Sequence, residues 1–117
     1  MLGDNVVREN ELAYAVRDAF LVTLLHTLVI TKRHVSGYFE LGRAELNACR
    51  ELLEQEKGAI EQADASVEGF NVGINDGAAA GQTIFHCHVH LIPRPKGDVE
   101  DPTGGVRNVI RGKGAYW

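Results

Sequence analysis

The sequence predicts a single α+β domain, in which an α-helix packs against one face of an antiparallel sheet. Short β-branched and apolar segments outnumber helical ones, and one long helical segment lies between them. The length of 117 residues allows one core but not two. With 44% hydrophobic and 24% charged residues, the composition is that of an ordinary globular protein rather than a disordered one.

The first part of the chain predicts three strands. NVVREN and ELAYAVRD are expected to form two short strands around a turn at Glu9–Glu11. HTLVITKRH predicts a strand more strongly, because it is β-branched and apolar and ends in charged residues. The segment before it, DAFLVTLL, fits either an extended loop or a strand.

A long amphipathic helix is predicted over ELGRAELNACRELLEQEKGAIEQADA. Glu51, Glu54 and Lys57 lie largely outside its apolar stripe. The stripe comprises Leu46, Cys49, Leu53, Ile60 and Ala63. FNVGIN and TIFHCHVHLIP then predict two more strands, joined by the glycine-rich loop DGAAAGQ. After Pro93 the chain becomes a turn-rich tail.

Charge, hydropathy and cysteine usage indicate which partners and which cellular compartment to expect. The net charge of −4 and a pI near 5.7 argue against a nucleic-acid binder, which normally carries a basic excess. The longest apolar stretch, Ala19–Ile30, is too short and too polar to span a membrane. The N-terminus lacks the order of a signal peptide. Cys49 and Cys87 are isolated, so buried free thiols in a reducing cytoplasm are expected.

The segment FHCHVHLIP holds three of the five histidines of the chain. Because a strand alternates its faces with period two, His86, His88 and His90 are expected on one face. The opposite face would pack into the core through Phe85, Cys87, Val89 and Leu91. The histidine face is then available for a metal site, a catalytic site or a solvated surface without chemistry. His34 is expected to be structural.

The spacing of the three histidines favours catalysis over metal binding. Neighbouring residues on one face of a strand lie about 6.5–7 Å apart, so three in a row rarely converge on one ion. No Asp or Glu within this strand could support such a site. A neutral imidazole, in contrast, attacks phosphorus readily near neutral pH. The preceding loop NDGAAAGQT could hold a phosphate through backbone N–H groups and through Gln82 and Thr83.

These residues resemble the histidine triad (HIT) superfamily. HCHVHLI fits the pattern His-φ-His-φ-His-φ-φ, where φ is apolar, and GINDGAAAGQTIFHCHVHLIPR is similar to its signature. AVRDAFLVTLLHTLVITKRHV resembles the first nucleotide-binding segment of the family. The resemblance predicts a HIT domain over residues 1–97. The tail, residues 98–117, is similar to the ends of bacterial dinucleoside-polyphosphate-hydrolase-like members, and it belongs to the same domain or packs at a dimer interface.

The resemblance implies a five-stranded antiparallel sheet with one long helix and a short one on one face. It also implies a homodimer whose two sheets join. The implied activity is that of a nucleotidyl hydrolase or transferase acting on a purine nucleotide, through a covalent nucleotidyl-histidine. Dinucleoside polyphosphates and nucleoside phosphoramidates both remain open as substrates, as does a non-catalytic nucleotide sensor or scaffold. No metal or other cofactor is required, although Mg²⁺ can enter as part of the substrate complex.

The roles implied for the histidines are unequal. His88 matches the nucleophile, and His86 matches the first histidine of the triad, near the phosphate and the leaving group. His90 matches the third, which helps to order the site behind the nucleophile. His26, in LHTLVI, matches an additional histidine that supports the triad from a neighbouring strand.

Four further residues are implied to bind the nucleotide. Asp18 matches a residue that binds the ribose hydroxyls, and Asn75 matches an asparagine near the ribose and the phosphate. Gln82 and Thr83 match a pair that contacts the phosphate.

Three segments depart from the family pattern. Relatives often have PGH or PxH, VIPKRH and VIPGKG where this chain has TLLH, VITKRH and VIRGKG. Each difference removes a proline and with it a fixed φ angle. We expect these differences to affect the shape and stability of the pocket rather than the mechanism. The zinc-binding cysteine pattern of some branches of the family is absent.

Overall fold

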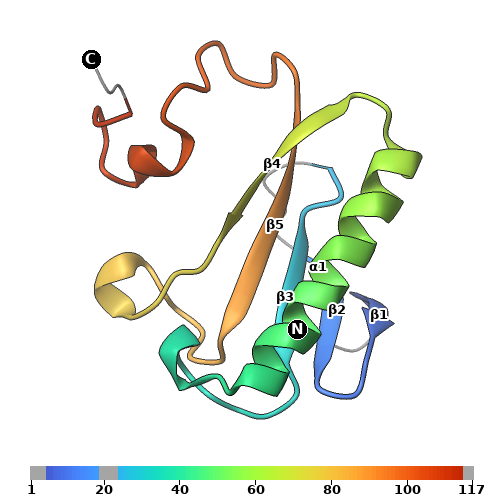
Figure 1. Cartoon of the computed structure of the whole chain (residues 1–117). Coiled ribbons are helices and arrows are strands. Elements are labelled where there is room, and N and C mark those ends of the chain that lie inside the picture. Colours follow the sequence, from blue (N-terminus) through green and yellow to red (C-terminus); the bar gives the residue numbers. More distant parts are fainter. Residues whose placement is uncertain (1–4, 19–23, 115–117) are drawn as a thin grey trace.

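The computed structural model describes residues 5–18 and 24–114 of the chain (Figure 1). Its five strands form one antiparallel sheet in the order β1-β2-β3-β5-β4. The strands are β1 (Val6–Glu9), β2 (Ala13–Arg17), β3 (Thr27–Thr31), β4 (Val67–Gly73) and β5 (His88–Pro95). The predicted α+β class with a five-stranded antiparallel sheet is therefore confirmed. Most of the segment DAFLVTLL lies outside the described residues.

A side-chain turn closes the first hairpin and ties it to the helix. The side-chain oxygen of Asn10 accepts hydrogen bonds from the backbone N–H groups of Leu12 at 3.1 Å and Ala13 at 3.0 Å. Its amide nitrogen donates to the carbonyl of Ala48 at 2.9 Å. The predicted turn at Glu9–Glu11 is thus confirmed, because Asn10 can bond the backbone of the following residues and reach the helix as well.

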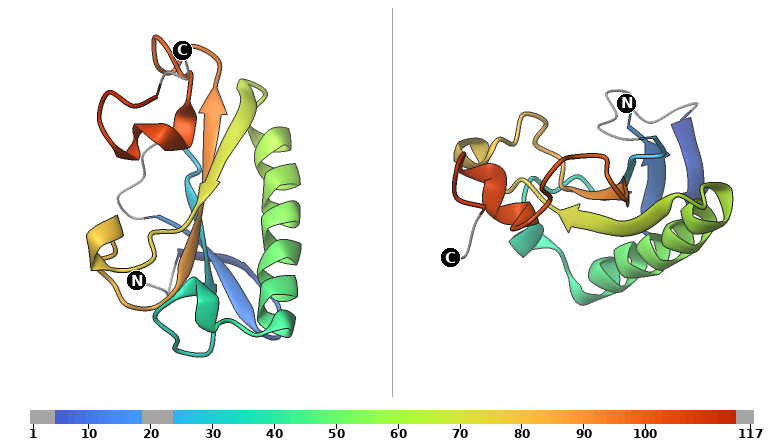
Figure 2. Two further views of the ribbon diagram at one scale, coloured as in Figure 1. Left: turned by 60° about the vertical axis from the view of Figure 1, so that its left-hand side comes forward. Right: turned by 90° about the horizontal axis from the view of Figure 1, so that it is seen from above.

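One face of the sheet is covered by α1 (Arg43–Ala63), which packs against β2, β3 and β5. The predicted helix is confirmed, with fewer residues at both ends. It begins after Gly42, whose N–H donates to the carboxylate of Glu45 at 2.9 Å. The remaining helical segments of the described residues are short 3-10 turns: η2 (Tyr38–Glu40), η3 (Ala78–Ala80) and η4 (Gly105–Val109). Figure 2 shows η3 and η4 on the side of the sheet opposite α1.

The apolar stripe of α1 differs in part from the predicted one. Cys49 and Ile60 are buried as expected, but Leu52 is fully buried where Leu53 was expected, and Ala63 is exposed. The main core joins helix and sheet through Ala13, Ala15, Val29, Cys49, Leu52 and Val89. The helix stripe shifts because two glutamates also face the sheet.

Glu56 is one of these glutamates, and it links α1 to the first two strands. Its side chain is only 2% exposed and accepts hydrogen bonds at 2.7 Å from Arg8 on β1 and from Arg17 on β2. Burial raises the pKa of Glu56, but the two guanidinium groups outweigh this effect and hold the pKa below its ordinary value. The carboxylate is therefore charged and paired at neutral pH. Arg17 also donates to the hydroxyl of Thr27, which extends the network to β3.

Glu45, near the start of α1, forms a similar link. Arg33 donates to both of its carboxylate oxygens, at 3.0 and 2.7 Å. This pair joins the segment after β3 to the first turn of the helix. No helix of the described residues is both long and apolar enough to cross a membrane.

Replacing Glu56 by alanine is expected to lower the free energy of unfolding by about 3 kcal/mol. This is the lower end of the range for breaking a buried ion pair, because Arg8 and Arg17 retain some contact with water. Glu61→Ala is the matched control, since it removes an exposed pair with Lys57 on the same helix and should cost only a small fraction of that loss. Urea denaturation measures both variants, and equal losses would contradict the role given to Glu56.

Candidate active site

The histidine-containing segment forms a shorter strand than predicted. β5 begins at His88, and Thr83–Cys87 lie in a bend before it. Cys87, immediately before the strand, and Val89 and Leu91 within it are buried, which confirms the expected alternation at these three positions. Phe85 is 49% exposed, so its predicted place in the core was wrong. The reason is that the backbone N–H of Cys87 bonds the carbonyl of Val35 at 2.7 Å, and the chain turns away from the sheet before that point.

His86 consequently does not share a strand face with the other two histidines, which corrects a second expectation. Its Nε2 lies 2.6 Å from the backbone carbonyl of Thr31, at the end of β3. The ring of His34 meets the ring of His86 edge to face, with 4.8 Å between centroids. His34 was expected to be structural, and this contact, which the sequence did not predict, gives it a role in holding His86.

The imidazole of His88 is held in one tautomer by its own backbone. Its Nδ1 lies 2.8 Å from the carbonyl oxygen of His86. A carbonyl oxygen can only accept, so in the neutral ring Nδ1 carries the proton and Nε2 carries the lone pair. The ring packs against His90, with 5.2 Å between centroids. His88 therefore offers an oriented nucleophilic nitrogen.

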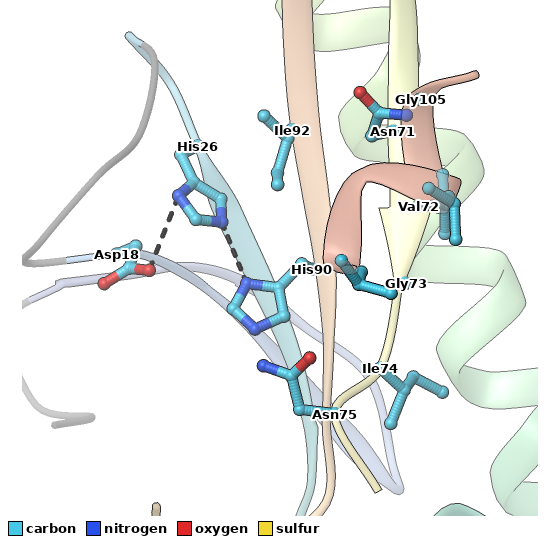
Figure 3. Close-up of a pocket in the computed structure, with 12 residues that line it drawn as sticks. Asp18, His26, Asn71, Val72, Gly73, Ile74, Asn75, His90, Ile92 and Gly105 are labelled. Carbon is cyan, nitrogen blue, oxygen red and sulfur yellow. Dashed lines mark hydrogen bonds and ion pairs between the residues drawn. The ribbon is translucent and has the colours of Figure 1, made fainter. Parts of the chain in front are cut away.

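Behind His88, three side chains from neighbouring strands form a chain of contacts (Figure 3). His26 Nδ1 lies 3.4 Å from a carboxylate oxygen of Asp18, and His26 Nε2 lies 3.0 Å from His90 Nδ1. With the Nδ1 proton of His26 directed toward the carboxylate, its Nε2 accepts from the Nδ1–H of His90. His90 then keeps a lone pair on Nε2, a buried atom without a hydrogen-bond partner among the described residues.

Burial keeps this histidine pair neutral. Desolvation lowers the pKa of His26, against the opposing effect of the Asp18 charge. Desolvation also lowers the pKa of His90, and the neighbouring rings of His88 and His26 lower it further, while Asp18 raises it. Two neutral imidazoles beside the nucleophile can accept or pass on protons near neutral pH.

A cavity of about 500 Å³ opens beside these three side chains. Its lining includes residues of η4, which lies on the side of the sheet opposite α1 (Figure 2). Its polar lining comes from Asp18, His26, His90, Asn71 and Asn75. Its aliphatic lining comes from Val72, Ile74, Ile92, Val106 and Val109, the last two on η4. The tail thus forms one wall of the cavity. Size and lining suit a small ligand with one apolar part and a few hydrogen-bonding groups.

The glycine-rich loop lies next to this face. Gly77 and Gly81 have φ angles of 96° and 97°, which favour glycine. The side chain of Gln82 is buried and holds the loop: it accepts from the N–H of Gly77 and donates to the carbonyls of Ser36 and Ile84. Thr83 is exposed. The phosphate contacts expected of Gln82 and Thr83 stay predictions, and the structure gives Gln82 a role in ordering the loop.

The structure thus brings together Asp18, Asn75, His26 and His90 around one cavity, with His88 adjacent to His90. His86, His88, Gln82 and Thr83 are not among the residues that line this cavity. Asn71 does, although the sequence analysis did not identify it. Two-residue alternation along β4 could have found it, since Asn71 and Gly73 share the face that continues to Asn75. No sequence pattern indicated that the tail residues Val106 and Val109 line the cavity.

Residues 2–97 match the family model described as HIT domain. The chain belongs to the HIT family. An uncharacterized 16.1 kDa HIT-like protein of Mycoplasma pneumoniae is 42% identical over 88 residues, which cover 75% of this chain and 60% of that protein. A HIT family protein from Bacillus anthracis has a solved structure that matches with a TM-score of 0.73 and 40% identity, over 78% of this chain and 64% of that one.

Two HIT relatives carry an activity in their names. Adenylylsulfatase HINT3 of Arabidopsis thaliana is 34% identical over 90 residues, covering 77% of this chain and 45% of that protein. Bis(5'-nucleosyl)-tetraphosphatase [asymmetrical] of Schizosaccharomyces pombe is 34% identical over 100 residues, covering 86% of this chain and 54% of that protein. The chain therefore spans about half the length of these two relatives, and their activities belong to the longer proteins.

Leu25, immediately before His26, has a strained backbone. Its φ of 67° is the one positive φ of a non-glycine residue in the described part of the chain. A side chain makes this left-handed conformation cost about 1–2 kcal/mol. The family pattern PGH puts glycine at this position. The Leu25 carbonyl accepts a hydrogen bond from the Thr27 hydroxyl at 2.8 Å. This bond to the first residue of β3 stabilises the turn that positions His26 in the site.

Leu25→Gly is expected to raise the free energy of unfolding by about 0.5–1 kcal/mol. The substitution removes the left-handed strain, and the greater freedom of glycine in the unfolded chain offsets part of the gain. Leu24→Gly is the control, because Leu24 has no positive φ and is 67% exposed, so only the loss from added chain freedom applies. Thermal and urea unfolding measure both, and stabilisation by both changes, or by neither, would contradict the assignment of strain.

The neutral histidine pair also makes stability depend on pH. The folded-state pKa values of His26 and His90 lie below the ordinary 6.5, so between these values and about 6.5 the unfolded chain binds more protons. Stability should be fully present above about pH 7 and decrease as pH falls through 6.5. His90→Asn should flatten this dependence in urea titrations. A wild-type stability that rises as pH falls through this window would exclude the assignment.

Proposed function

We propose that the chain is a nucleotidyl hydrolase or transferase that cleaves at the α-phosphate of a purine nucleotide through a covalent nucleotidyl-His88. The observation that carries the proposal is the hydrogen bond from His88 Nδ1 to the His86 carbonyl, which leaves the lone pair on Nε2. A nucleophile of this kind needs no metal or other cofactor to be activated.

The reaction has two steps. His88 Nε2 attacks the α-phosphorus, a P–N bond forms, and the bond from phosphorus to the leaving group breaks. The leaving group takes a proton, and the resemblance to the HIT family, rather than a contact in the structure, makes His86 the proposed donor. In the second step water attacks the same phosphorus, the P–N bond breaks and His88 regains its neutral form. His90 keeps a lone pair on Nε2, so this nitrogen can accept the proton of the water.

The cavity beside His90 is expected to hold the nucleoside. Its aliphatic wall suits the face of a purine base, while Asp18 and Asn75 supply the polar groups expected near the ribose and phosphate. No lysine or arginine is among the described residues that line it. A polyphosphate leaving group would therefore have to bring its own counter-charge, which is consistent with substrates used as Mg²⁺ complexes.

Leaving-group preference separates the candidate activities. The names of the two relatives point to different leaving groups, a sulfate and a nucleoside polyphosphate, which supports chemistry at the α-phosphate without selecting one partner. Dinucleoside polyphosphate hydrolysis, as in the dinucleoside-polyphosphate-hydrolase-like branch, is our first proposal. Because the lining carries no lysine or arginine, a nucleoside phosphoramidate with a small leaving group is the second. A nucleotide sensor without turnover is the alternative from a different class.

We further propose a cytoplasmic homodimer in which the two sheets join along β4. This edge strand has seven residues against four in β1, and it exposes Val72 to 50%. An apolar groove of about 440 Å³ lies beside it, between β4 and α1, with Leu46, Leu53 and Ile74 in its lining. Cys49 and Cys87 are free and buried, which fits a reducing compartment.

His88→Gly is expected to lower steady-state turnover by at least about a thousandfold, because the covalent route is removed. Turnover of diadenosine tetraphosphate and of adenosine phosphoramidate should be measured side by side to rank the two substrate classes. Added imidazole should restore part of the activity of His88→Gly, since it can occupy the vacated space. Full activity of this variant would exclude the nucleophile assignment. Tight nucleoside monophosphate binding by a wild-type protein without turnover would favour the sensor.

A further inference from the structure

Three side chains that can each supply a metal ligand meet at one end of the cavity. Asp18 follows β2, His26 precedes β3 and His90 lies on β5, and one ligand atom from each lies within 4.8 Å of the others. Figure 3 shows the two rings and the carboxylate directed toward one another. This trio differs from the three consecutive histidines whose spacing argued against a metal, because it is assembled from three adjacent strands rather than from one.

The distances are close to those of a zinc site. Bonds of 2.0–2.2 Å in a tetrahedral arrangement put ligand atoms roughly 3.3–3.5 Å apart. His26 Nδ1 already lies 3.4 Å from Asp18, and His26 Nε2 lies 3.0 Å from His90 Nδ1. Only one nitrogen of His26 can bind an ion, so one of these contacts opens when the ion enters. The widest separation, up to 4.8 Å, then has to close by about 1.4 Å, which side-chain rotation can supply.

The ligand types select the class of ion. Two imidazoles with one carboxylate suit Zn²⁺ and similar divalent transition metals, whereas Mg²⁺ and Ca²⁺ prefer sites built from oxygen. The trio leaves a fourth position open toward the cavity, where a water or a substrate oxygen could bind. No lysine or arginine is among the described residues that line the cavity to repel the ion.

The two ring nitrogens of His90 differ in their surroundings. Its Nε2 is buried and has no hydrogen-bond partner among the described residues. Figure 3 shows Nδ1 of His90 directed toward His26 and Nε2 on the far side of the ring, so Nδ1 is the nitrogen placed to bind the ion.

We propose that Asp18, His26 and His90 bind one Zn²⁺ per chain, and that this ion and the nucleotide exclude each other. Bound zinc would occupy the carboxylate expected at the ribose and the imidazole expected behind the nucleophile. Zinc is then an inhibitor of the site rather than its cofactor. The inhibition rests on the proposed function, whereas the binding site does not depend on it.

Zinc binding can be measured without turnover. The full chain, freed of metal by a chelator, is titrated with Zn²⁺ alone against a chromophoric competitor, and Co²⁺ is added separately to record its visible absorption. The expected result is one ion per chain and the strong absorption of a four-coordinate cobalt site. Asp18→Asn and His26→Asn should each weaken zinc binding by tenfold or more, and Asp18→Asn keeps the test valid if His26→Asn does not fold.

Two variants serve as controls. Glu61→Gln changes an exposed carboxylate on α1 and should leave zinc affinity unchanged. His88→Asn removes the proposed nucleophile, which is not one of the ligands, and should change zinc affinity less than twofold. The inference is overturned if the wild type binds no zinc, if Asp18→Asn binds it as tightly as Glu61→Gln does, or if His88→Asn loses it as fully as Asp18→Asn.

Turnover separates this inference from the proposed function. If the protein hydrolyses nucleotides, Zn²⁺ at the concentrations that fill the site should inhibit, and a chelator should restore the rate. Hydrolysis that persists with the site filled overturns the mutual exclusion. Zinc bound as expected by a protein without nucleotide turnover supports the metal site and contradicts the proposed function. Nucleotide turnover by a protein that binds no zinc supports the proposed function and contradicts the metal site.

Discussion

The pairing of β5 on both of its edges is the constraint on which the site depends. Val89 and Leu91 pair with residues of β3, and Leu91 also pairs with Val72 of β4. The buried side chains of Val89 and Leu91 fix which face of the strand meets the core. His88 and His90 must then point to the opposite face, away from α1. The bend that precedes the strand puts the carbonyl of His86 within 2.8 Å of His88 Nδ1. Tertiary packing therefore selects the tautomer of the proposed nucleophile.

Buried charge and strain are concentrated where strands and helix must be held together. Glu56 joins α1 to β1 and β2 through two arginines, and Glu45 joins the helix to Arg33 beyond β3. Leu25 keeps a left-handed turn next to His26. These features hold the strand ends from which Asp18 and His26 reach His90. Supporting contacts of this kind keep a reactive ring in place without touching the substrate.

The sequence predicted those features of the fold that depend on residues close together in the chain. Alternation gave the buried face of β5 at Cys87, Val89 and Leu91, and helical periodicity gave Cys49 and Ile60 on α1. Alternation failed at Phe85 and His86, because the start of β5 depends on a bond between Cys87 and the distant carbonyl of Val35. Glu56 was missed because a charged residue signals a helix surface unless its arginine partners are known. The contact between Asp18 and His26, and the wall formed by η4, also follow from tertiary packing rather than from sequence spacing.

The proposed function depends on a covalent bond between His88 and the nucleotide. The most direct test is to mix the wild-type protein with diadenosine tetraphosphate, stop the reaction in alkali within the first turnover, and map the modified peptide by mass spectrometry. We expect an adenylyl group (AMP) attached to His88 and to no other histidine, and its loss when the reaction is left to complete. An adduct on His86 or His90, or turnover without any adduct, would contradict it.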